Sequence, residues 1–239
     1  MTKWLNFVWL FAAQGLLAQH STSGLIAPGP KDESCCIYMP KSGFTLYSGP
    51  GQSSIGKLEY KKNEDGTIEP YVAVVALNDQ DSPKELGWDG LKEVGYEVLA
   101  ITFFDRNSGF IRILNEQVNY WVEESEVTAA GYQVETWQEY MTRKAGKVLG
   151  FYPVEPLNLR AGPSTSEEKV KTLEGTNIEM TSTGEHKGQW SKVKVIKYKK
   201  HPCEGGEPGE ENIEFELEGW VKAIDDSGSP NVWHFTRGC

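Results

Sequence analysis

Alternation of apolar and polar residues along the chain predicts a protein built from short β-strands. Residues 213–218 (IEFELE) alternate apolar side chains with glutamates, and residues 190–198 (WSKVKVIKY) alternate valines with lysines. A period of two places successive side chains on opposite faces of a strand. Lysines on one such strand and glutamates on the other would pair charges across a sheet. Further β-rich runs at 71–77, 96–104 and 109–114 favour an all-β fold.

A short motif occurs twice in the chain. Residues 43–53 (GFTLYSGPGQS) and 156–170 (PLNLRAGPSTSEEKV) both pass from an alternating run through Gly-Pro into a small polar loop. Gly tolerates backbone angles that other residues avoid, and Pro fixes φ and lacks an N–H donor, so the pair ends a strand. Placed 113 residues apart, the copies share four residues: Leu46 and Leu159, Gly49 and Gly162, Pro50 and Pro163, Ser53 and Ser166. The repeat predicts two copies of one small β module.

The two modules are predicted to span residues 35–130 and 151–239, with an ordered connector over 131–150. Thr136 and Glu139 have the spacing of a capping box, in which each residue satisfies a backbone donor of the other. The connector is therefore expected to contain a short helix from about Trp137 to Lys144.

The N-terminus has the pattern of a secretory signal. Lys3 precedes the apolar run 4–18, and a polar stretch of small residues follows, which predicts cleavage after Ala18. The alternative is an anchor helix, but about 15 apolar residues are short for a span that needs about 20. The mature protein is expected to be exported, periplasmic or extracellular, without stable membrane insertion. Residues 19–34 are predicted to form a flexible leader.

Composition restricts the function classes. The formal net charge of −10 argues against nucleic acid as a partner, because nucleic-acid binding requires clustered Lys and Arg. In an oxidising compartment Cys203 and Cys239 are disulfide candidates, while the adjacent Cys35 and Cys36 could be free thiols or pair externally. The chain has no C-x-x-C and its four His are scattered, so neither a metal site nor a cofactor is expected.

Three ordered elements of the second module belong together: residues 157–164 (LNLRAGPS), 190–193 (WSKV) and 219–221 (GWV). In this order they resemble the bacterial SH3-like (SH3b) family. The first module resembles a degenerate copy, with Tyr47 in place of Arg160 and Phe110 in place of Trp190. The resemblance implies two small SH3-like β-barrels joined by a short helical connector, and binding to cell-wall peptides or protein partners.

The candidate ligand-binding residues are aromatic, with one arginine. Trp and Tyr offer a large rigid surface with one polar group, and the guanidinium fork of Arg suits a carboxylate such as a peptide terminus. Two alternatives stay open. The tryptophans of the second module could fill the core, and the arginine could form only a surface ion pair. The candidates are Tyr47, Trp121, Arg160, Trp190 and Trp220.

The chain is predicted to be a non-enzymatic, exported binding module for peptidoglycan peptide or a protein partner, with no catalytic residues. One alternative is a wall hydrolase that uses Cys35 or Cys36 with His186 or His234. Another is a structural subunit whose modules only present loops to a partner.

Overall fold

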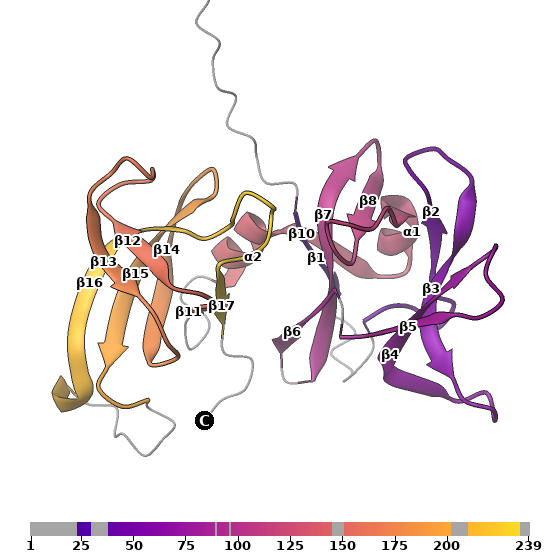
Figure 1. The fold of residues 1–239 in the computed structure, drawn as a ribbon, viewed down its shortest axis with the longest axis horizontal. Coiled ribbons are helices and arrows are strands. Elements are labelled where there is room, and N and C mark those ends of the chain that lie inside the picture. Colours follow the sequence, from indigo (N-terminus) through magenta and orange to yellow (C-terminus); the bar gives the residue numbers. More distant parts are fainter. Residues whose placement is uncertain are drawn as a thin grey trace, which may run out of the picture.

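The fold was analysed in a computed structural model, which describes residues 23–29, 38–88, 90–95, 97–144, 151–201 and 210–234. The four cysteines and the predicted signal segment 1–18 lie outside these residues. Two antiparallel sheets lie side by side with helix α2 between them (Figure 1). The protein is therefore predominantly β, as the alternating pattern predicted. In the part of the chain that is described, no helix combines the length and apolar character needed to cross a membrane.

The first sheet has ten strands. Its order is β10-β1-β7-β8-β9-β2-β3-β4-β5, and β6 pairs with β7 outside this path. The strands are β1 (Gly24–Pro28), β2 (Phe44–Tyr47), β3 (Ser54–Lys62), β4 (Ile68–Leu77), β5 (Lys84–Gly87), β6 (Leu91–Gly95), β7 (Val98–Asn107), β8 (Phe110–Ile113), β9 (Trp121–Glu123) and β10 (Tyr132–Thr136).

The second sheet has seven strands in the order β13-β12-β16-β15-β14-β11-β17. No closed barrel is found among the described strands of either sheet, because each order begins and ends at different strands. A short 3₁₀ helix, η2 (Glu210–Asn212), leads into β16. The strands are β11 (Phe151–Pro153), β12 (Leu157–Arg160), β13 (Lys169–Leu173), β14 (Ile178–Lys187), β15 (Trp190–Tyr198), β16 (Ile213–Lys222) and β17 (Val232–His234).

Each sheet buries the apolar side of its alternating strands. In the second sheet Leu159, Val193, Val195 and Val221 are at most 1% exposed and form one core. A separate core in the first sheet includes Phe44, Leu46, Leu58, Ile101, Phe103 and Ile113. Removal of this apolar surface from water is the main stabilising contribution of both cores.

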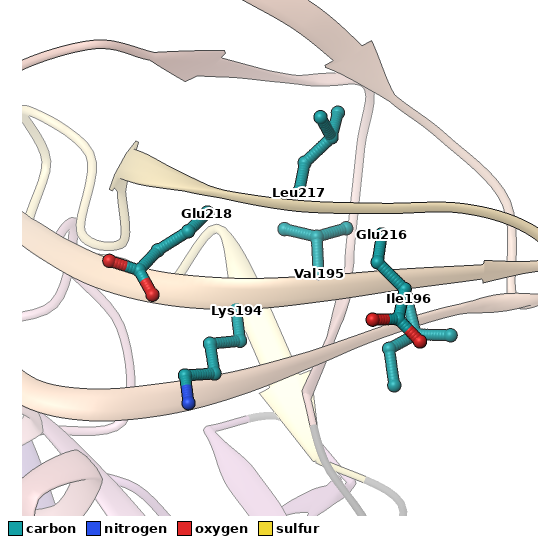
Figure 2. Close-up of a pocket in the computed structure, with 6 residues that line it drawn as sticks. All are labelled: Lys194, Val195, Ile196, Glu216, Leu217 and Glu218. Atoms are coloured by element: carbon teal, nitrogen blue, oxygen red, sulfur yellow. The ribbon is translucent and has the colours of Figure 1, made fainter.

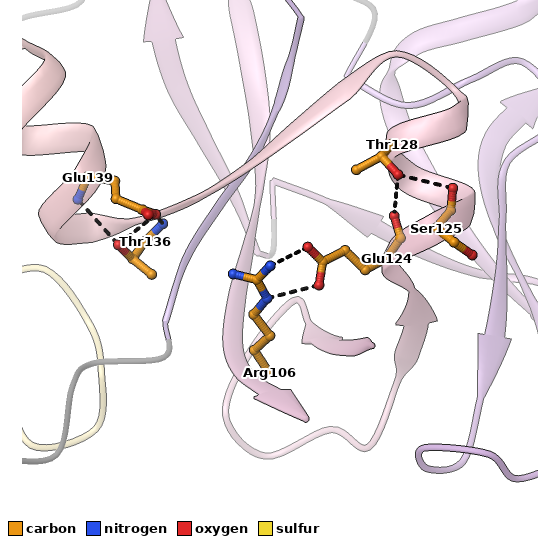
Figure 3. A network of polar contacts seen from close by, with 6 residues as sticks. All are labelled: Arg106, Glu124, Ser125, Thr128, Thr136 and Glu139. Carbon is orange, nitrogen blue, oxygen red and sulfur yellow. Dashed lines mark hydrogen bonds and ion pairs between the residues drawn. The ribbon is translucent and has the colours of Figure 1, made fainter. Parts of the chain in front are cut away.

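Helix α2 (Trp137–Lys144) has the bounds that the capping box predicted. The backbone N–H of Glu139 donates to Thr136 Oγ1 at 3.2 Å, and the N–H of Thr136 donates to Glu139 Oε2 at 2.7 Å (Figure 3). A second helix, α1 (Glu124–Ala129), follows β9 and was not predicted. Its first residue, Glu124, accepts hydrogen bonds from the guanidinium of Arg106 on β7 (Figure 3).

The prediction of a flexible leader over 19–34 was wrong for β1. This strand lies between β10 and β7, and Leu25 and Ile26 are fully buried. Likewise, β10 occupies the start of the predicted connector 131–150 and pairs with β1 along its length. The leader prediction failed because the strands that stabilise β1 are distant in sequence, while its own composition of small residues and Pro suggested a flexible segment.

The two copies of the sequence motif have the same pattern of strand pairing. β2 pairs with β3 and, through Tyr47, with Trp121 of β9; β12 pairs with β13 and, through Arg160, with Trp220 of β16. The pairing with the following strand shifts register at the same place in both copies, directly after Leu46 or Leu159. The two halves therefore share a local strand arrangement and not only a short motif.

Helix α2 contacts both sheets through an aromatic cluster. The rings of Trp137 and Tyr140 on the helix pack against Trp233 on β17, with centroids 5.5 and 6.0 Å away. We call these three residues the aromatic joint. The side chain of Gln138 donates to the backbone carbonyl of Gly188 in the β14–β15 turn. Since α2 also packs on β1, the aromatic joint connects the second sheet to the first.

Candidate functional site

The outward face of the second sheet carries most of the predicted ligand-binding residues. On β15, Ser191 and Val193 are buried, whereas Trp190 and Lys192 are half-buried on the opposite side. On β16, Trp220 likewise lies opposite the buried side of its strand. Trp190 and Trp220 therefore do not fill the core of this sheet, which was the alternative that the sequence left open.

Strand register arranges this face into two rows of cross-strand partners. In one row Trp190 lies between Lys187 of β14 and Lys222 of β16. In the other row Trp220 lies between Lys192 of β15 and Arg160 of β12, and Arg160 is in turn the partner of Lys169 on β13. Partners in adjacent strands are about 5 Å apart and extend to the same side of the sheet. We call these seven residues the basic-aromatic patch: Arg160, Lys169, Lys187, Trp190, Lys192, Trp220 and Lys222.

Two lysines of the patch are neutralised by acids. Lys192 Nζ lies 3.0 Å from Glu218 and 3.1 Å from Glu185, and these hydrogen bonds, with that of Glu218 the stronger, raise the pKa of Lys192. Lys222 Nζ lies 2.6 Å from Asp226 and lowers the pKa of that carboxyl. The contact between Lys192 and Glu218 is an ion pair of the kind expected from the Lys and Glu alternation of β15 and β16.

The other three cations of the patch have no ion pair among the described residues: Arg160, Lys169 and Lys187. Arg160 Nη1 donates to the backbone carbonyl of Glu167 at 2.7 Å, so the guanidinium is held by the loop that follows β12. The alternative of a surface ion pair at Arg160 therefore does not apply within the described chain. The unpaired cations leave a locally positive surface on a protein of net charge −10.

A shallow hollow adjoins the patch along β15 and β16. Its volume is about 360 Å³, and it is lined by three cross-strand pairs. Figure 2 shows the charged side chains on one side of the two strands, with Val195 and Leu217 on the other side. The lining pairs are Lys194 with Glu218, Val195 with Leu217, and Ile196 with Glu216.

At the end of the hollow that is farther from the patch, the same face becomes acidic. Glu179 of β14 and Glu216 of β16 are the two partners of Ile196. Burial raises the pKa of Glu179, against a smaller opposing effect of the hydrogen bond from the hydroxyl of Tyr198, 3.4 Å away. Charge therefore changes sign along the strands, from the patch at one end to these carboxylates at the other.

The equivalent face of the first sheet has a different chemistry. Tyr47 and Trp121 are partners as Arg160 and Trp220 are, but Trp121 is only 8% exposed. Tyr47 packs edge-on against Phe110, with centroids 5.3 Å apart. Asn107 and Glu123, the partners of Phe110, stand where the second sheet has Lys187 and Lys222. Tyr47 and Trp121 thus lie apart from the basic-aromatic patch, in a sheet where four of its five cations are replaced, by Tyr47, Ser54, Asn107 and Glu123.

Among the residues weighed for catalysis, His186 alone is described in full. His186 Nδ1 lies 2.8 Å from Ser191 Oγ, and its Nε2 is buried without a hydrogen-bond partner among the described residues. Burial lowers the pKa of His186. Because Ser191 is only 2% exposed, this pair is not accessible to a substrate. Within the described chain, no group of His, Cys, Asp or Glu is arranged to hold a metal ion.

Sequence reasoning missed the lysines of the patch as a group. The Lys and Val alternation placed Lys192 on the polar face of its strand, but Lys169, Lys187 and Lys222 join the patch only through strand register. The only sequence signal for these three lysines is that each lies within a few residues of one of the motif elements 157–164, 190–193 and 219–221. Comparison of the chain with protein-family models, curated proteins and solved structures finds no match.

Proposed function

We propose that this chain is an exported, non-enzymatic binding module that takes a cell-wall peptide, or a peptide segment of a surface or periplasmic protein, on the basic-aromatic patch. The proposal includes two SH3-like units, the first of them degenerate. The resemblance of the second module to the SH3b family supports it, as does the matching strand pairing of Tyr47 and Arg160 in the two halves.

The observation that carries the proposal is the outward position of two tryptophans. Trp190 and Trp220 occupy diagonal positions in adjacent rows, each between two cations. Neither indole stacks on another ring within the described chain. Half-buried Trp with adjacent Arg is the composition of binding hot spots, since a partner can cover a rigid ring with little loss of side-chain entropy.

Binding is favoured over catalysis by the chemistry of the patch. Indole rings and ion-paired lysines orient a ligand, but they do not supply a nucleophile activated by an adjacent base. The hydroxyl group of Ser191, which contacts His186, is buried beneath the sheet surface. The competing function is the hydrolase that would use Cys35 or Cys36 with a histidine, and it requires a direct test.

The binding test uses the full chain and soluble wall peptides released by digestion of purified peptidoglycan. We expect the peptides to change Trp fluorescence with a saturable curve, and Trp220→Ala to weaken binding at least tenfold. The matched control is Trp88→Ala, which removes an indole that is 62% exposed on the first sheet. Equal binding by the wild type and Trp220→Ala would overturn the proposed site.

A second assay separates binding from hydrolysis. Incubation of intact peptidoglycan with the wild-type chain is expected to retain the chain on the insoluble wall without release of soluble fragments. Release that disappears in the Cys35→Ser and Cys36→Ser variants would favour the hydrolase instead. These substitutions leave the basic-aromatic patch unchanged, so wall retention serves as their control.

A further inference from the structure

We infer that the patch recognises the free α-carboxylate of a peptide, held by Arg160 and Lys169, with the terminal side chain lying on Trp220. This inference rests on the proposed function. It names the ligand group that would determine the orientation of the bound peptide on the patch. It follows from the register of β13, β12 and β16 and from the pattern of ion pairs on the face.

The register of β13, β12 and β16 places Lys169, Arg160 and Trp220 next to one another. Arg160 is the cross-strand partner of Trp220 on one side and of Lys169 on the other. Adjacent strands are about 4.8 Å apart, so an anion of the size of a carboxylate can contact both cations while its neighbouring carbon lies over the indole. The edge position of β13 leaves Lys169 exposed at the end of the row.

Arg160 is oriented before any ligand arrives. One N–H of its Nη1 donates to the carbonyl of Glu167, which leaves the second N–H of Nη1, together with Nε and Nη2, as the remaining donors. The side chain of Glu167 is directed at Gly162, where an added Cβ would lie 2.8 Å from its Cγ and Cδ, and it forms no ion pair with Arg160. A guanidinium fixed at one end loses less side-chain entropy on binding a planar carboxylate.

The charges around the row favour one carboxylate over a polyanion. Lys192 is already paired with Glu218 and Glu185, so beside Trp220 only Arg160 and Lys169 remain unpaired. A polyanion gains affinity from several unpaired cations. It would also extend onto Glu218 on β16, where like charges repel. A singly charged terminus with an apolar side chain avoids this repulsion.

The test compares two acetylated tetrapeptides, Ala-Ala-Ala-Leu with a free C-terminus and the same sequence as a carboxamide, by competition with labelled wall peptides. We expect the free acid to compete about tenfold better than the amide, as expected for a charge-assisted hydrogen bond. Arg160→Gln should abolish this difference, and Lys169→Gln should reduce it severalfold. Because Lys169 is exposed, its substitution tests the inference even if Arg160→Gln alters the fold.

The first sheet offers a matched control. Arg112 is the partner of Trp121, and its Nη1 also donates to a backbone carbonyl, that of Glu116. Arg112→Gln should leave the preference for the free acid unchanged. Two further ligands identify the source of the charge: a peptide amide with an Asp side chain, and polyphosphate. Better competition by either than by the free acid would overturn the inference.

We call the inferred contact of the α-carboxylate with Arg160 and Lys169 the anchor. The experiments distinguish failure of the anchor from failure of the proposed function. If wall peptides bind and Trp220→Ala abolishes binding, but acid and amide compete equally, the anchor is overturned and the proposed function stands. If Arg160→Gln weakens acid and amide alike, the arginine acts on the fold of the site, and Lys169→Gln decides: an unchanged preference for the free acid in that variant overturns the anchor. Failure of both wall peptides and tetrapeptides to bind would overturn the proposed function together with the anchor.

Discussion

Trp137 on α2 and Trp233 on β17 meet edge to face, with ring centroids 5.5 Å apart and planes at 85°. Trp137 belongs to the helix that packs on the first sheet, and Trp233 belongs to the second sheet. Edge-to-face pairs stabilise a protein by more than the burial of their surface area, because the positive edge of one ring meets the negative face of the other. The contact indicates that the two sheets are stabilised together.

Trp137→Ala is therefore expected to lower the free energy of unfolding by about 3–5 kcal/mol, since the side chain is only 2% exposed and its loss leaves a cavity. Urea unfolding followed by circular dichroism measures this change. Trp88→Ala is the control, because Trp88 is 62% exposed and its removal loses only the stacking on Tyr71, so the unfolding free energy should change by about 1 kcal/mol or less. Equal effects of the two substitutions would show that the aromatic joint does not stabilise the protein.

The capping box of α2 gives a second prediction. Thr136→Ala removes the acceptor of the Glu139 N–H and should cost about 1 kcal/mol of unfolding free energy. Thr142→Ala on the same helix is the control. The hydroxyl of Thr142 only donates to the carbonyl of Gln138 and is exposed, so its loss should be close to neutral. A result in which Thr142→Ala is as destabilising as Thr136→Ala would contradict the capping role.

How far the sequence predicts this fold depends on how local the cause of each element is. Strand β15 and helix α2 have the bounds that alternation and the capping box indicated, because those signals lie within the elements. Strand β1 was missed because its stability comes from distant partners. The Cβ of an alanine at Gly24 would lie 1.9 Å from the carbonyl oxygen of Glu135, so glycine there reflects a contact that no local pattern records.

The candidate site was predictable to the same extent. Arg160 and Trp220 stand in local motifs, and their type suggested binding. That Lys169 is the partner of Arg160 depends on the register shift between β12 and β13, and that Trp121 is buried depends on the packing of the first sheet. Both are tertiary properties. The sequence therefore predicted the residue types of the site, while register determined which of them lie together.

Two buried tyrosines in the first core should respond to loss of the hydroxyl in opposite ways. Tyr60 Oη accepts hydrogen bonds from the backbone N–H groups of Tyr38 and Met39, at 2.8 and 3.1 Å. Tyr60→Phe leaves both donors unsatisfied and should cost about 1–3 kcal/mol. Tyr38 Oη is buried with no hydrogen-bond partner in the described part of the chain, so Tyr38→Phe should be neutral or stabilising by up to about 1 kcal/mol.

The rings of these tyrosines pack edge to face at 5.1 Å, and phenylalanine preserves that contact in both variants. The comparison therefore isolates the hydroxyl groups. Thermal unfolding of the two variants under identical conditions measures the difference. A Tyr38→Phe variant that is less stable than Tyr60→Phe would show that the assignment of the hydrogen bonds is wrong.

His186 makes stability depend on pH. Burial lowers the pKa of its imidazole below the ordinary value of 6.5, because Nε2 is buried with no partner in the part of the chain that is described and the charged ring would lose hydration. The unfolded chain then binds more protons than the folded chain in the range between the two pKa values. The stabilisation from a neutral His186 is therefore complete above about pH 6.5 and decreases as the pH falls through this range towards the pKa of the folded state.

The prediction concerns the difference between the wild type and His186→Asn, measured as unfolding free energy from pH 8 to pH 5. Glu179, whose pKa is raised by burial, changes stability in the opposite direction, and the subtraction removes its contribution. The wild type should lose stability relative to His186→Asn as the pH falls below about 6.5. Parallel curves for the wild type and His186→Asn would show that the half-buried imidazole beside Ser191 does not control the acid sensitivity of the second sheet.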